Sequence, residues 1–357
     1  MGSPFVEPLL AIAKDSAAMQ MAGTIMLAIF GLCAIVWAMI IARLTRRQPL
    51  APLWPRRQVP WSWWLVLLAF VLYILVTGLI LEGAQVVMYG NLNGGNQNKS
   101  QQLTLVLAAS AIGGFVSTLL TAAVLNSAGA NKIDLGLDTR WFRTDLLLGL
   151  AGFLAVLPVV FLIKWLLLPF SQENHPLEQV MRNQPSPSMI FWITLVAVVA
   201  APVVEEFLLR VVFQGWLERC FFRGAQPEVA QEVLVMEQPD DPTSPALFDA
   251  SIPYAAPPRL EASAISVSGP LELNHWETAG METEQFVPSG WRAAMPIVIS
   301  SVLFAGMHFG HGIDPIPLFF LAVVLGWLYQ RTHRLWPCVV LHTALNGLSM
   351  TMMFLAS

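Results

Sequence analysis

The chain has 357 residues, of which 56% are hydrophobic and only 12% are charged, and its mean hydropathy is +0.62. Soluble globular domains carry about 25% charged residues, so this composition excludes an ordinary soluble enzyme and predicts an all-α polytopic membrane protein. The isoelectric point of about 5.9 and the lack of a basic patch in the sequence also exclude a nucleic-acid-binding protein.

Eight apolar segments predict about eight transmembrane helices, since a spanning helix needs about 20 apolar residues. Four segments are long: Met21–Ala42, Ser62–Leu81, Leu103–Leu125 and Leu146–Phe170. Four others are shorter or interrupted by polar groups: Met189–Val204, Ala293–Met307, Pro317–Tyr329 and Trp336–Phe354. We predict three N-terminal helices over residues 1–125 and a catalytic membrane core over residues 145–223 and 291–357. The last four helices are expected to enclose a polar active-site cavity.

The charge of the loops predicts their orientation, because Lys and Arg gather in cytoplasmic loops. Loop 43–61 has five Arg and no acid, and loops 126–145 and 330–335 are also rich in Lys and Arg. This pattern places both termini outside the cytoplasm and residues 224–290 inside it. That segment has 11 Asp and Glu against one Arg, and it has nine of the 25 prolines. We predict a disordered, acidic cytoplasmic insert that can recruit a basic protein partner.

Two adjacent carboxylates follow the fifth apolar segment. On a helix, Glu206 and Arg210 are four residues apart and can form an ion pair, while Glu205 points about 100° away and stays outside that pair. A carboxylate in apolar surroundings with no partner is suited to act as a general base. The structural alternative is a helix end at the cytoplasmic interface, with both acids in water.

Two further polar pairs have the same four-residue spacing. Phe304 and His308 end the sixth segment, and His342 and Asn346 lie in the last one. A neutral imidazole can orient a water or bind a metal, and imidazole and amide can donate hydrogen bonds to an oxyanion. The alternatives are an interfacial histidine and polar contacts that hold helices together. At about 1.5 Å per residue, Glu205 and His308 fall at different depths unless one helix starts outside the bilayer or a segment is re-entrant.

The three polar sets together resemble a known family. Glu-Glu-x-x-x-Arg, Phe-x-x-x-His and His-x-x-x-Asn, in this order in late membrane helices, look like the motifs of the CPBP intramembrane proteases. That family includes the type II CAAX prenyl endopeptidases and the bacteriocin-immunity proteins. The resemblance covers about residues 145–355. It implies an endopeptidase that hydrolyses a peptide bond in or near the bilayer.

The resemblance also implies roles for the matching residues. Glu205 would activate the water with the help of His308. His342 and Asn346 would stabilise the tetrahedral oxyanion. The residues that would support this site are Glu206, Arg210 and Phe304.

The resemblance leaves the metal open. The family has been described as metalloproteases, and Glu205, His308 and His342 would suit a zinc site of two His and one Glu. Metal-free, glutamate-dependent hydrolysis is the competing mechanism. We favour it because Asn346 is a poor zinc ligand but a good oxyanion donor, so the expected cofactor is either none or zinc.

The expected partners are membrane lipid and a peptide or protein substrate, and the expected location is a bacterial-type inner membrane. A prenylated CAAX tail is the eukaryotic precedent for the substrate, while a bacterial-type protein could cut leader peptides or bacteriocins. Two other functions fit the same residues. One is a non-catalytic membrane scaffold or immunity protein, and the other is a proton-coupled transporter with Glu205 and His308 as a relay.

Overall fold

The computed structural model describes residues 6–51, 58–90, 99–170, 186–222, 290–310 and 312–356. These residues form helices joined by turns and short connections, in agreement with the all-α prediction. The acidic insert predicted over 224–290 lies outside the described residues, apart from Gly290, which begins a helix.

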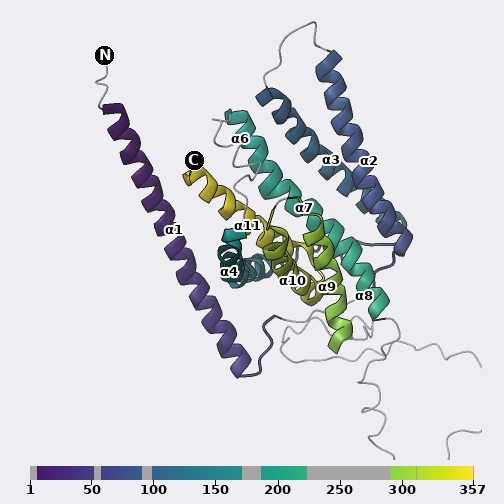
Figure 1. Cartoon of the computed structure of the whole chain (residues 1–357). Helices are drawn as coiled ribbons and strands as arrows, with labels where there is room; N and C mark the ends of the chain where they lie inside the picture. Colours follow the sequence, from purple (N-terminus) through teal and green to yellow (C-terminus); the bar gives the residue numbers. More distant parts are fainter. Residues whose placement is uncertain are drawn as a thin grey trace, which may run out of the picture. The chain divides into compact units, whose positions relative to one another are not determined.

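The N-terminal half contains four long helices. Their bounds are α1 (Val6–Thr45), α2 (Trp63–Gly90), α3 (Lys99–Ser127) and α4 (Phe142–Leu167), the last continued by the short 3₁₀ helix η1 (Leu168–Phe170). Helices α2 and α3 lie side by side (Figure 1), and α1 packs mainly on α4. Gly113 of α3 allows α2 and α3 to pack closely, because a Cβ at this position would lie 2.8 Å from the Cα of Thr77 on α2. The small residue thus lets the two backbones approach closely.

The fifth span is a single helical stretch, Pro187–Phe221. It consists of α6 (Pro187–Thr194), the π-helical η2 (Leu195–Ala200), α7 (Ala201–Glu206), the π-helical η3 (Phe207–Gln214) and α8 (Gly215–Phe221). Ser186 caps its start by accepting a hydrogen bond from the backbone N–H of Met189. Two π-helical segments therefore flank α7, and such segments often occur at functional sites.

Three helices form the C-terminal part: α9 (Gly290–Gly306), α10 (Pro315–Thr332) and α11 (Leu335–Ala356). Helix α10 ends at His333, which adopts a left-handed conformation with φ of 49°. Arg334 then pairs with the buried Asp145 of α4, with Nε and Nη2 at 2.7 Å and 2.6 Å from Oδ1. This ion pair fixes the start of α11 against α4, and α11 packs along α4 and α10.

Six helical stretches in the described part of the chain are long and apolar enough to cross a membrane. They are Gln20–Thr45, Trp63–Val87, Gln101–Ser127, Phe142–Phe170, Pro187–Phe221 and Leu335–Leu355. Helix α9 is shorter, and α10 is not among the six. The predicted count of eight therefore stays a prediction. Large apolar side chains such as Leu79 (71% exposed) and Leu119 (70% exposed) point outward, as they do where a helix faces lipid.

Candidate functional site

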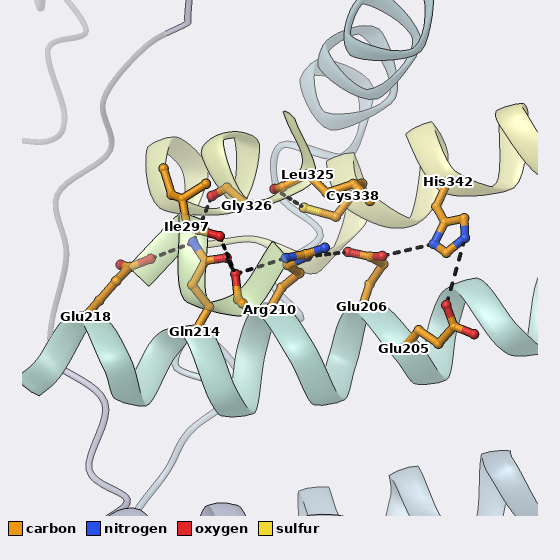
Figure 2. Close-up of polar contacts among 11 residues, drawn as sticks. Glu205, Glu206, Arg210, Gln214, Glu218, Ile297, Leu325, Gly326, Cys338 and His342 are labelled. Carbon is orange, nitrogen blue, oxygen red and sulfur yellow. Dashed lines mark hydrogen bonds and ion pairs between the residues drawn. The ribbon is translucent and has the colours of Figure 1, made fainter. Parts of the chain in front are cut away.

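One side of the fifth span carries a row of buried polar residues. Glu206, Arg210, Gln214 and Glu218 follow one another at four-residue spacing, and all four are fully buried. In an α-helix, residues four apart drift around the axis by about 40°. The wider π-helical turns of η3 rotate less per residue and counteract this drift. The row therefore stays on one side of the helix, facing α9, α10 and α11 (Figure 2).

Glu206 is held on both carboxylate oxygens. Its Oε2 accepts a hydrogen bond from Nε of Arg210 at 3.0 Å, which is the ion pair expected from the sequence. Its Oε1 lies 2.9 Å from Nδ1 of His342 on α11. A buried carboxylate is tolerated only when it is paired and hydrogen-bonded, and these two contacts provide that. Glu206 thereby joins the fifth span to the last helix.

Glu205 has a different environment from its neighbour. Its Oε2 lies 4.0 Å from Nε2 of His342, and this oxygen is buried without a hydrogen-bond partner in the described part of the chain (Figure 2). The sequence placed Glu205 near a helix end, but it lies near the middle of the 35-residue stretch Pro187–Phe221. His308 and His342 lie against the same Phe304 ring, and His342 is the residue that faces Glu205. The structure thus brings Glu205 and His308 into one cluster, although their depths differed in the sequence-based count.

Phe304 lies at the centre of the cluster and is fully buried. Its ring centroid is 5.0 Å from that of His308 and 5.6 Å from that of His342. The guanidinium of Arg210 lies over the same ring, 5.4 Å from its centroid, in a cation–π contact. Nδ1 of His308 lies 2.9 Å from the carbonyl oxygen of Phe304, which orients that imidazole. One aromatic ring therefore packs against three polar side chains of the site.

Asn346 uses one amide hydrogen in a contact between helices. Its Nδ2 donates to the carbonyl oxygen of Ala197 in η2 at 2.8 Å. That carbonyl is available because of the local backbone. The N–H of Ala201 bonds to Val196 instead, and Pro202 has no N–H to offer. Asn346 thus satisfies a backbone acceptor that the π-helical segment leaves open.

The residues do not fit the zinc site that the family resemblance left as an alternative. Among the described residues, no three His, Cys, Asp or Glu side chains come together in an arrangement that could hold a metal ion. A zinc site of Glu205, His308 and His342 is therefore not supported.

Ser300, Gln214 and Glu218 extend the polar cluster and were not identified from the sequence. Nη1 of Arg210 donates to Oγ of Ser300 at 3.1 Å. Nε2 of Gln214 donates to Oε1 of Glu218 at 2.9 Å and to the carbonyl oxygen of Gly326 at 2.8 Å. The four-residue spacing was the available signal, since Gln214 and Glu218 continue the row of Glu206 and Arg210.

The predicted polar cavity is not confirmed. A cavity of about 260 Å³ lies between α9 and α10. Its lining is apolar: Ala294, Ile297, Val298, Val323, Val324 and Trp327. None of the predicted site residues lines this cavity, so the polar cluster described above is distinct from it.

Comparison with known proteins gives one match. Residues 279–348 match the family model described as type II CAAX prenyl endopeptidase Rce1-like. The matched segment includes Phe304, His308, His342 and Asn346, but not the Glu205–Arg210 segment. The match supports the CPBP/CAAX protease family for this chain, and with the apolar helices it supports an integral membrane protein. No curated protein and no solved structure matches the chain.

Proposed function

We propose that this chain of the CPBP/CAAX protease family is an intramembrane endopeptidase that uses Glu205 as its general base. The observation that carries the proposal is the buried Oε2 of Glu205, which has no hydrogen-bond partner among the described residues and faces Nε2 of His342 at 4.0 Å. The neighbouring Glu206 is fully paired. One carboxylate is thus committed to structure, and the other is available for chemistry.

The separation of Glu205 and His342 suits a single water molecule. A distance of 4.0 Å is too long for a direct hydrogen bond, but one water can bond to both atoms at about 2.8 Å. Glu205 takes a proton from this water, and the water oxygen attacks the peptide carbonyl carbon. The same proton then passes to the amide nitrogen as the C–N bond breaks. His308 orients the water.

His342 and Asn346 are the proposed oxyanion donors. Because Nδ1 of His342 bonds to Glu206, the ring must carry both protons to donate from Nε2. The carboxylates of Glu206 and Glu205 together balance the charges of Arg210 and this ring. Asn346 has two amide hydrogens and gives one to Ala197. The other remains for the oxyanion, and stabilising such an oxyanion commonly lowers the barrier to peptide hydrolysis more than any other single interaction.

The first substrate class to test is a prenylated peptide ending in a CAAX tail, because the matching family model describes such endopeptidases. Unmodified membrane-bound peptides, such as leader peptides and bacteriocins, are the second class. A bacterial-type inner membrane and a cytoplasmic acidic insert remain part of the proposal on sequence grounds.

The test uses the full chain in liposomes with fluorogenic farnesylated and unmodified peptides. Glu205→Gln keeps the shape of the side chain and removes the base, so the rate of cleavage should fall by at least about 100-fold. The matched control is Glu82→Gln, at an exposed carboxylate of α2, which should leave the rate unchanged. Full activity in Glu205→Gln would eliminate Glu205 as the base. A wild-type chain that cleaves neither peptide class but binds a basic partner would favour the scaffold.

A further inference from the structure

We infer that Ser300 and Gln214 are positioning residues, which hold Arg210 so that it fixes Glu206 and, through it, the imidazole of His342. The inference deepens the proposed function and rests on it for the activity measurements. It starts from an unbroken series of buried polar contacts along the fifth span: His342, Glu206, Arg210, Ser300, Gln214 and Glu218.

Arg210 depends on few polar contacts. Its guanidinium is fully buried, and it has hydrogen bonds to Glu206 through Nε and to Ser300 through Nη1. Its Nη2 has no hydrogen-bond partner among the described residues. Ser300 is therefore the only described residue besides Glu206 that anchors the guanidinium by a hydrogen bond. Removing the Ser300 hydroxyl leaves the guanidinium with Glu206 as its one described hydrogen-bond partner, so it can shift within its contact with the Phe304 ring.

Gln214 in turn bonds to the hydroxyl of Ser300, whose single hydrogen also has the carbonyl oxygen of Ile297 within reach at 3.0 Å. Its Oε1 accepts from Oγ of Ser300 at 3.1 Å, while its Nε2 uses both hydrogens on Glu218 and Gly326. These three partners determine the orientation of the amide. The amide of Gln214 also packs closely against the backbone of α10, because a Cβ at Gly326 would lie 2.9 Å from its Oε1. The amide can therefore adopt one arrangement in the intact network.

The effect on His342 follows from this geometry. Glu206 shares its two oxygens between Arg210 and His342, so a shift of the guanidinium moves the carboxylate that orients the imidazole. The ring nitrogen that faces Glu205 would then leave its position. Because Ser300 and Gln214 touch neither Glu205 nor the proposed water, their loss should slow the reaction without weakening substrate binding.

Neighbouring serines on α9 provide a matched test. Ser300 and Ser301 are both fully buried, but Oγ of Ser301 has no hydrogen-bond partner among the described residues. We expect Ser300→Ala to lower kcat about tenfold with KM within about twofold, and Ser301→Ala to leave both unchanged. Gly326→Ala, which crowds Gln214 without removing a polar group, should act in the same direction as Ser300→Ala. Equal kcat values for the two serine variants would overturn the inference.

A second measurement works without any substrate. The ring nitrogens of His342 are observed by ¹⁵N NMR of histidine-labelled full chain in detergent and are assigned by their loss in His342→Gln. Ser300→Ala should shift the Nδ1 resonance, whereas Ser301→Ala should not. Identical spectra for both would overturn the positioning role. If the shift appears but the wild-type chain cleaves no peptide, the proposed function fails while the positioning of His342 by Ser300 stands.

Discussion

Nδ1 of His342 on α11 lies 2.9 Å from Oε1 of Glu206 on α7, and this contact decides which ring nitrogen faces Glu205. A carboxylate bonded to one nitrogen of an imidazole fixes the orientation of the ring. Glu206 therefore supports the site through His342, while the adjacent Glu205 faces Nε2 of the same ring. Glu206 thus has a structural role and Glu205 the proposed chemical one, so their substitutions should affect the stability of the protein differently.

Glu206→Gln should destabilise the protein, and Glu205→Gln should not. Loss of the Glu206 charge leaves Arg210 as an uncompensated buried cation, which typically costs about 3–5 kcal/mol. Glu205 has no hydrogen bond to lose on its buried Oε2 and only a 4.0 Å contact with His342, so neutralising it should change the melting temperature little. Thermal unfolding of both variants in one detergent measures this difference. Equal destabilisation would show that the two acids share the structural role.

Phe304→Leu should weaken the site while keeping an apolar side chain of similar size. The substitution removes the ring contacts to His308 and His342 and the cation–π contact to Arg210. We expect about 1–2 kcal/mol lower stability and a clear loss of kcat. Phe320→Leu, at an exposed position of α10, is the matched control and should change neither. Unaltered kcat in Phe304→Leu would mean that the ring does not hold the histidines in place.

The hydrogen bond of Asn346 to Ala197 should become dispensable when Pro202 is replaced. Asn346→Leu leaves the carbonyl of Ala197 without its partner, at an expected cost of about 1 kcal/mol. Pro202→Ala supplies the backbone N–H that the π-helical segment lacks at this position. The double variant should therefore lose less stability than the sum of the single variants. Strict additivity in thermal unfolding would contradict this explanation of the contact.

Peptide cleavage should remain impaired in that double variant. If Asn346 also donates to the oxyanion, Pro202→Ala restores stability but not kcat. Recovery of both would assign Asn346 a purely structural role between helices.

A pH-dependent contribution is expected from the connection between α3 and α4. Arg140 donates hydrogen bonds to Asp138 and lowers the pKa of that carboxyl below its usual value. A lowered folded-state pKa stabilises the fold above the unfolded pKa of about 3.9, and the gain is lost as the pH falls through the folded value. Because the Arg140 side chain is 72% exposed, the gain should stay below about 1 kcal/mol.

Unfolding of wild type and Asp138→Asn across a pH series measures this contribution. The difference should be constant near neutral pH and should vanish in acid. Arg140→Met should remove the same increment. A difference that grows as the pH falls would contradict the assignment of the lowered pKa to this pair.

The sequence predicted the helices and several local pairs, because those depend on neighbours in the chain. The Glu206–Arg210 pair follows from four-residue spacing on any helix. The fifth apolar segment was predicted to end at Val204, because Glu205 and Glu206 interrupt it. In the structure Glu206 pairs with His342 of α11, and Arg210 and Gln214 bond to partners on α9 and α10, so the helix continues through these polar residues to Phe221.

An all-helical membrane protein, the order of its polar motifs and the spacing within each motif can all be read from the chain, since composition and periodicity are local properties. The packing of the helices determines which of those motifs meet. It paired Glu206 with His342, left Oε2 of Glu205 without a hydrogen-bond partner among the described residues, and gave one amide hydrogen of Asn346 to Ala197. The physical reason is that a buried polar group must find its partner wherever packing places one, and the packed partners here come from helices far apart in the sequence.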